Sequence, residues 1–245
     1  MTALSTLAPR RFWRLIVSDA MNVGRDPMLI FAAAMSLAPV AIFLFFRESI
    51  DAAAFDAFGV SDAMRYAAAP ALILPAVLMG WVTGFLLLED RDEGTLTAID
   101  VTPVGKTGFL GYRVAVTVVI VFAIVLVSVP AVVPEAGAAT GTLLAVLIAC
   151  EAAVVAMLLP ALARNKVEGL ALTKVMNLAI LFPLAAILPS PWRYLAGIVP
   201  SYWIGDLLAV SGVVYLATPV AIGIAVAIHA IAMTAAFRFF RQSRV

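Results

Sequence analysis

Long stretches without charged residues alternate along the chain with short clusters of charged residues. Most of the uncharged stretches have about the 20 residues that an α-helix needs to cross the ~30 Å hydrocarbon core of a bilayer. The final uncharged run, residues 207–237, is too long for one upright helix, so we place the last span in its second part. The predicted spans are residues 28–46, 66–88, 114–134, 140–163, 175–188 and 213–237.

Composition supports a membrane location for the whole chain. Of the 245 residues, 64% are hydrophobic and 13% are charged, whereas soluble domains have roughly 45–50% apolar and about 25% charged residues. The net charge of +1 gives no indication of a nucleic-acid partner. The single cysteine, Cys150, excludes an intrachain disulfide and a C-x-x-C metal site. We therefore expect one all-α integral membrane domain over residues 1–245, with no metal and no cofactor of its own.

The distribution of Lys and Arg predicts the topology. Thirteen of these residues fall on one side of the predicted spans and only Arg47, Arg65 and Arg193 on the other. Basic residues in short loops stay on the cytoplasmic side. Both termini are therefore expected in the cytoplasm. We further expect the protein in the plasma membrane of a prokaryotic cell.

Two segments flank this core of spans. Near the N-terminus, apolar residues recur at helical spacing opposite a row of arginines, which predicts an amphipathic helix lying on the cytoplasmic membrane face or against the spans. The apolar residues are Trp13, Ile16, Val17, Ala20 and Met21, and the arginines are Arg10, Arg11 and Arg14. Before the last span, residues 191–206 hold four aromatic residues. These predict either interfacial anchoring or a segment that re-enters the membrane as a lid.

The most polar stretch lies between spans two and three, at residues 89–103. After five charged residues, Gly94 interrupts the run at a position that suggests a positive φ, and Thr95 can cap a helix. Leu96, Ile99 and Val101 then give a short apolar edge before Pro103 ends the segment. This order predicts a two-turn amphipathic helix on a stiff loop beneath the membrane.

The same stretch resembles the acidic, Gly-Thr-Leu and Thr-Pro pattern that follows the second span of ABC-2 type permeases, the membrane subunits of a class of ABC exporters. The segments at 25–27 and 200–203 are also similar, and the small drug-export branch is the most similar. Thr97 and Asp100 depart from the apolar pattern of the family. In the family this stretch is a coupling helix that contacts the ATP-binding subunit. An ordinary solvated loop is the alternative.

The resemblance implies which residues would couple this chain to an ATPase: Glu89, Glu93, Gly94, Thr95, Leu96, Ile99, Thr102 and Pro103. It further implies a separate ATP-binding subunit that holds ATP and Mg, and a second permease subunit, identical or homologous. The cargo would be a hydrophobic or amphipathic small molecule. Gly105-Lys106-Thr107 resembles the end of a phosphate-binding loop, but Asp100 stands where that loop needs a glycine. We therefore expect no ATP site in this chain.

Two ionisable residues lie inside predicted spans. From the cytoplasmic ends, Glu151 is about 16 Å deep and His229 about 12 Å deep, so the two could meet. Structural pairing, contact with substrate and proton handling all remain open, because a lone carboxylate in a bilayer is costly and must face a partner or a cavity. Ser128 and Asn177 are expected to form hydrogen bonds between helices.

Two other classes of protein could contain an ionisable pair inside apolar spans. A proton-coupled secondary transporter using Glu151 is the main alternative, although such proteins usually contain paired repeats and none is visible here. An intramembrane protease would need a serine opposite His229 or two aspartates inside the spans. Span four has no serine, and no aspartate lies in any span. No catalytic residues are therefore expected.

Overall fold

The computed structural model describes residues 17–18, 21, 24–25, 27–102, 105–209 and 216–242. Most of the predicted N-terminal amphipathic helix and Pro103 lie outside these residues. In chain order, the elements are α2 (Pro27–Met35), α3 (Ala38–Phe58), α4 (Met64–Asp92), α5 (Thr95–Asp100), α6 (Gly105–Val132), α7 (Ala138–Leu162), α8 (Lys166–Met176), the 3₁₀ segments η2 (Asn177–Ile187) and η3 (Trp192–Ile198), α9 (Pro200–Leu207) and α10 (Thr218–Gln242).

Six helical stretches in the described part of the chain are long and apolar enough to cross a membrane. They overlap the six predicted spans, and the protein is a multi-pass membrane protein. The first stretch is longer than predicted, because it covers Leu29–Phe58 instead of ending at residue 46. The fifth combines α8 with η2, over Lys166–Ile187.

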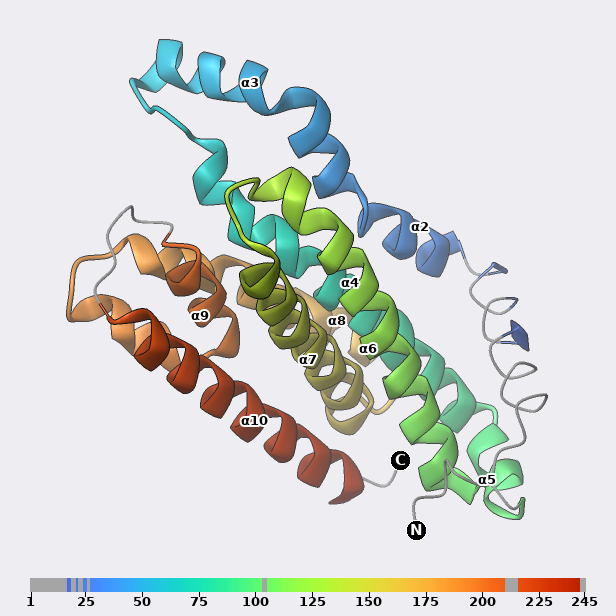
Figure 1. Cartoon of the computed structure of the whole chain (residues 1–245). Helices are drawn as coiled ribbons and strands as arrows, with labels where there is room; N and C mark the ends of the chain where they lie inside the picture. The colour runs from blue at the N-terminus through green and yellow to red at the C-terminus, as the bar shows by residue number, and fades with distance from the viewer. Residues whose placement is uncertain are drawn as a thin grey trace.

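The extension of the first stretch has a local cause. Residues after Arg47 include the helix-favouring run Ala52–Ala54, so the charged residues lie on a helix that continues out of the apolar part. Gly59 ends this helix with φ 67°, a left-handed conformation that glycine adopts without steric cost. Figure 1 shows α3 projecting away from the other helices at this end.

Helices α4 and α7 form the centre of the molecule. Most residues in their apolar windows are buried, whereas less than a third of the residues in the other four windows are buried. Glycines allow the close approach, since a Cβ on Gly80 would lie 2.7 Å from the Val155 side chain and 2.9 Å from the Ala152 carbonyl. In Figure 1, α10 lies on one side of α7 while α2 lies beyond α6 on the other.

Apolar side chains cover the outer faces of the peripheral helices. Phe45 in α3 is 77% exposed and Val127 in α6 is 76% exposed. Such side chains suit contact with lipid, whose hydrocarbon core excludes polar groups. The buried core and these exposed apolar faces together describe a bundle whose surrounding solvent is the bilayer.

Residues 191–206 differ from a simple interfacial anchor. Tyr202 and Trp203 of α9 are buried, and the Trp203 indole donates a hydrogen bond to the Gly197 carbonyl at 2.8 Å. Trp192 is exposed, as interfacial anchoring predicted for all four aromatic residues. The buried position of α9 follows from Gly205, because a Cβ there would lie 2.3 Å from the Pro183 carbonyl oxygen.

Arg193, one of the three basic residues predicted on the outer side, is fully buried beside α9. Its guanidinium is 2.6 Å from the Asp206 carboxylate, and its Nε donates to the Tyr202 hydroxyl at 3.1 Å. Burial raises the pKa of Tyr202, which lies outside the six apolar stretches, to about 12, although the guanidinium acts in the opposite direction. The ion pair therefore ties η3 to α9.

Candidate functional site

The short helix α5 lies at one end of the bundle, between α4 and α6 (Figure 1). Gly94 precedes it with φ 74°, as predicted, and Gly105 begins α6 with φ 62°. Thr95 does not cap the helix, since Gly94 is the N-cap residue and no side-chain cap hydrogen bond forms. The Thr102 hydroxyl donates to the Ile99 carbonyl at 2.7 Å. Two left-handed glycines and this local bond fix the direction of α5.

Leu96 faces the rest of the chain and not outward, although the sequence suggested that it forms an apolar edge for a partner. It is 4% exposed and belongs to a buried apolar cluster with Leu87 of α4 and Phe109 of α6. Ile99 packs against the same cluster. The apolar edge of α5 therefore anchors this helix to its own membrane domain.

The exposed face of α5 consists of other residues. Glu93, Thr97, Ala98 and Asp100 are exposed, and Val101 immediately after the helix is 88% exposed. Glu93, Gly94 and Thr102, three of the residues expected to couple to an ATPase, are on this accessible side. Any partner that contacts α5 meets a mainly polar surface with one large apolar side chain.

The acidic run before α5 is not a uniform solvated segment. Asp90 is buried, and its carboxylate lies 2.6 Å from the guanidinium of Arg113 in α6. Arg113 is 4% exposed and stacks over the Phe109 ring at 4.7 Å. A buried carboxylate needs a compensating charge, and Arg113 supplies it for Asp90. The ion pair therefore joins the end of α4 to the start of α6 beneath α5. No local sequence pattern links residues 90 and 113, so this pair could not be predicted from the sequence.

Two further charged residues of the run contact other helices. Glu89 forms an ion pair with Lys166 of α8 at 2.9 Å. Arg91 donates to the Pro160 and Ala163 carbonyls, each at 3.1 Å, at the C-terminal end of α7. Free carbonyls at a helix end favour such a cation. Glu89 and Arg91 therefore hold this end of the bundle together, and only Asp92 and Glu93 of the run are well exposed.

Glu151 and His229 meet in the core, as their depths predicted. His229 Nε2 lies 3.2 Å from Glu151 Oε1, and both side chains are less than 10% exposed. His229 Nδ1 lies 2.7 Å from the Ala225 carbonyl oxygen. A carbonyl only accepts, so Nδ1 carries a proton and Nε2 needs a proton between itself and Oε1. That proton makes either a carboxylic acid and a neutral imidazole, or a carboxylate and an imidazolium.

Other polar residues in the spans form contacts within the chain. The Thr83 hydroxyl of α4 pairs with the Thr117 hydroxyl of α6. Ser128 donates to the Ile124 carbonyl of its own helix at 2.6 Å, so its predicted bond to another helix is wrong. The Asn177 Oδ1 is buried with no hydrogen-bond partner among the described residues. No group of three potential metal ligands occurs in the described part of the chain.

Six apolar stretches, of which α4 and α7 form the packed centre and four lie around them, together with the short helix α5 after α4, agree with the layout expected of a permease-type membrane protein. Residues 19–237 match the family model described as fluoroquinolones export permease protein Rv2686c-like. The chain belongs to this family and is a small drug-export permease of the ABC-2 type.

Two relatives from Mycobacterium tuberculosis support the assignment. They are the fluoroquinolones export permease proteins Rv2686c of strain H37Rv and MT2760 of strain CDC 1551. Each is 32% identical over 214 residues, which cover 83% of this chain and 84% of the relative. No solved structure gives a significant match.

Proposed function

We propose that this chain is the membrane-spanning subunit of an ATP-driven exporter, with ATP and Mg bound by a separate subunit that contacts α5. The geometry of α5 is the observation that carries this proposal. The helix is outside the six apolar stretches, is aimed by Gly94 and Gly105, and is anchored through Leu96. A contact surface that must transmit force needs such rigid support.

The residues beneath α5 provide a path for that force. Leu96 packs against side chains of α4 and α6, and the Asp90–Arg113 ion pair joins the same two helices. A partner that displaces α5 would therefore move the end of α4 and the start of α6 together. Because α4 packs closely on α7 through Gly80, the displacement would reach the centre of the bundle.

The cargo and assembly follow from the family. The relatives are named for fluoroquinolone export, so we propose a fluoroquinolone or a similarly amphipathic small molecule as the substrate. Six spans are few for a translocation path, which favours a dimer with an identical or homologous permease. The α5 end and both termini would face the cytoplasm of a prokaryotic cell, as the excess of basic residues at that end indicates.

A proton-coupled mechanism through Glu151 is less favoured on physical grounds. The Glu151–His229 pair shares one proton and is neutral overall in either arrangement. Adding or removing a proton would leave a net charge at a site where both side chains are buried, and an unpaired buried charge is costly. Structural pairing is the role that the contact supports best.

The proposed contact with an ATPase can be tested by placing a glutamate at either of two exposed alanines. Ala98 is exposed on α5, and Ala138 is exposed at the opposite end of the bundle, at the start of α7. The chain would be copurified with the ATPase that it retains and reconstituted in proteoliposomes. We expect ATP-dependent, uncoupler-insensitive efflux of a fluoroquinolone from the wild type and Ala138→Glu, and loss of ATPase retention or of efflux in Ala98→Glu.

Two outcomes would count against the proposal. Efflux that needs a proton gradient and no ATP would favour the secondary transporter. Normal ATPase retention and efflux in Ala98→Glu would mean that the exposed face of α5 is not the contact with the ATPase.

A further inference from the structure

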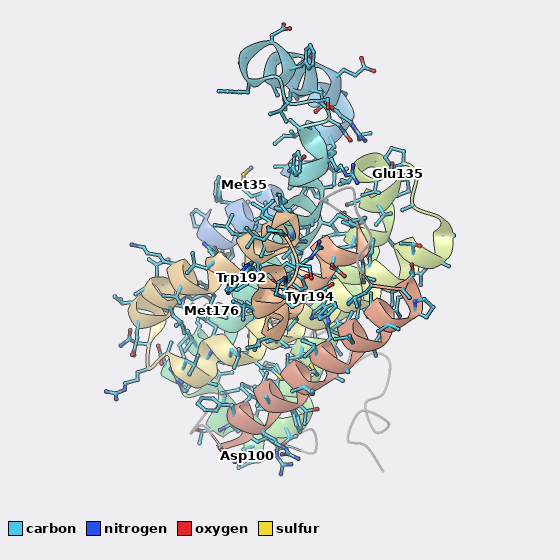
Figure 2. The ribbon with its side chains drawn as sticks, turned by 90° about the vertical axis from the view of Figure 1, so that its left-hand side faces the viewer. Met35, Asp100, Glu135, Met176, Trp192 and Tyr194 are labelled. Carbon is cyan, nitrogen blue, oxygen red and sulfur yellow. The ribbon has the colours of Figure 1, made fainter. Side chains whose placement is uncertain are left out.

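A cavity of about 240 Å³ lies between the start of α4, the end of α6 and the end of α9. Its charged lining residues are Arg47, Asp62, Arg65 and Glu135, and Val133 and Leu208 are among its apolar ones. Figure 2 shows Glu135 and Asp100, the last residue of α5, at opposite ends of the molecule. The cavity is therefore at the end that the proposed topology places outside the cell.

The four charged residues are not all neutralised by one another. Arg47 lies 3.5 Å from Asp62 and 4.0 Å from Asp51, so its guanidinium already faces two carboxylates. Among the described residues, no carboxylate lies within 4.0 Å of the Arg65 guanidinium and no cation within that distance of the Glu135 carboxylate. One positive and one negative group thus remain without a partner of opposite charge on the walls of the same cavity.

Arg65 is held in place without being neutralised. Its Nη2 donates to the Ala209 carbonyl at 2.6 Å, which ties the start of α4 to the end of α9. The start of α4 is also fixed by Asp51, whose carboxylate accepts the Met64 backbone N–H at 2.8 Å. A guanidinium has five N–H donors, so the carbonyl leaves donors for a further acceptor. Such preorganisation lowers the entropic cost of binding a ligand.

From this arrangement we infer that the cavity binds the zwitterionic part of an amphiphile, with its anionic group at Arg65 and its ammonium group at Glu135. Pockets for whole drug-sized ligands occupy roughly 300–1,000 Å³, so this smaller cavity suits a charged end whose apolar part lies along Val133 and Leu208. Two sources have this chemistry, the exported molecule and a phosphatidylethanolamine headgroup. For the exported molecule, the inference rests on the proposed function and specifies its substrate as zwitterionic.

Equilibrium dialysis of the purified chain in nanodiscs tests the inference without an ATPase. The probes are a zwitterionic fluoroquinolone, its ester without the carboxylate, and its N-acyl derivative without the ammonium. Arg65→Gln should weaken binding of the zwitterion about tenfold, which corresponds to about 1.4 kcal/mol. The same variant should bind the ester as tightly as the wild type does. Glu135→Gln should weaken the zwitterion similarly and leave the N-acyl derivative unchanged.

Glu48→Gln is the matched control, because Glu48 is exposed on α3 at the same end and does not line the cavity. The selective response to each derivative also separates lost recognition from misfolding, which would weaken all three probes. Nanodiscs with phosphatidylethanolamine identify the lipid as a ligand if they reduce drug binding to the wild type and not to Arg65→Gln.

Failure of the inference is distinguishable from failure of the export function. If all variants bind every probe as the wild type does, and phosphatidylethanolamine does not compete, the cavity is not a zwitterion site, whatever the efflux assay shows. If the charge-selective pattern appears but the wild type shows no ATP-dependent efflux, the site stands and the export function falls.

Discussion

The contact between Glu151 and His229 leads to a prediction about the stability of the bundle. His229 Nδ1 donates to the Ala225 carbonyl, so Glu151 is the partner of Nε2 among the described residues. Replacing Glu151 with leucine would leave a buried acceptor unsatisfied, and replacing His229 with leucine would leave a buried carboxyl group unsatisfied. Each loss costs about 1–3 kcal/mol in proteins generally.

The expected loss is smaller within a membrane. Hydrogen bonds between spans contribute about 0.6 kcal/mol on average and at most about 1.7 kcal/mol. We therefore expect each leucine variant to lose about 1–1.7 kcal/mol of unfolding free energy. Glu151→Gln should lose less than about 0.5 kcal/mol, since its amide can donate to Nε2. The double leucine variant should recover about 1–1.7 kcal/mol relative to the sum of the single variants, because neither polar group then remains.

Unfolding by sodium dodecyl sulfate in mixed micelles, followed by tryptophan fluorescence, would measure these differences. Glu151→Lys is the severe case, since it places a cation beside His229 in the core, and we expect it not to assemble. Strictly additive losses in the two single variants and the double variant would refute the reasoning, because additivity means that the two side chains do not interact in the membrane.

Three other predictions concern packing, the ion pair beneath α5 and topology. Gly80→Ala should lower the unfolding free energy by about 1–3 kcal/mol. Gly111→Ala should not lower it, because Gly111 has open space around it. Equal melting temperatures for these two variants would contradict the prediction. Asp90→Ala should cost about 3–5 kcal/mol in the same unfolding assay, because it removes the carboxylate that lies 2.6 Å from the buried Arg113 guanidinium; a loss below about 1 kcal/mol would indicate a hydrated pair. In a cysteine-free background, Thr97→Cys should resist a membrane-impermeant thiol reagent on whole cells and Glu135→Cys should react, and the reverse pattern would invert the topology.

The apolar helices could be predicted from the sequence because their cause is local. An uncharged run of about 20 residues is most stable as a helix in the hydrocarbon core of a bilayer. The positions of the spans can therefore be located from the uncharged runs in the sequence. The end of the first helix was misplaced for the same reason. Charge at Arg47 marks where the apolar part ends, but the helix itself ends only at Gly59, where the backbone becomes left-handed.

The candidate site shows where local reasoning stops. The turn at Gly94 follows from the sequence, since the change from charged to apolar residues needs a flexible position there. Which side of α5 faces inward depends instead on α4 and α6, and this contact buries Leu96. The pairings of Asp90 with Arg113 and of Arg193 with Asp206 are likewise set by packing. A sequence pattern can show that a charge lies near a span, but it cannot show which partner the fold provides.

Helix α4 connects the two candidate sites. It runs without interruption from Met64 to Asp92, about 44 Å at the usual rise per residue, with Arg65 at one end and Asp90 beneath α5 at the other. Pro70 and Pro75 lie near the Arg65 end, where missing hydrogen bonds make bending easiest. Glu135, by contrast, is on the connection between α6 and α7.

Movement of α5 by an ATPase should therefore change the separation of Arg65 and Glu135, which would release a zwitterion held between them. Spin labels at neighbouring exposed positions, Asp62 and Ala138, would report this in the complex with its ATPase. An unchanged distance distribution with and without ATP would mean that α4 does not couple the two ends.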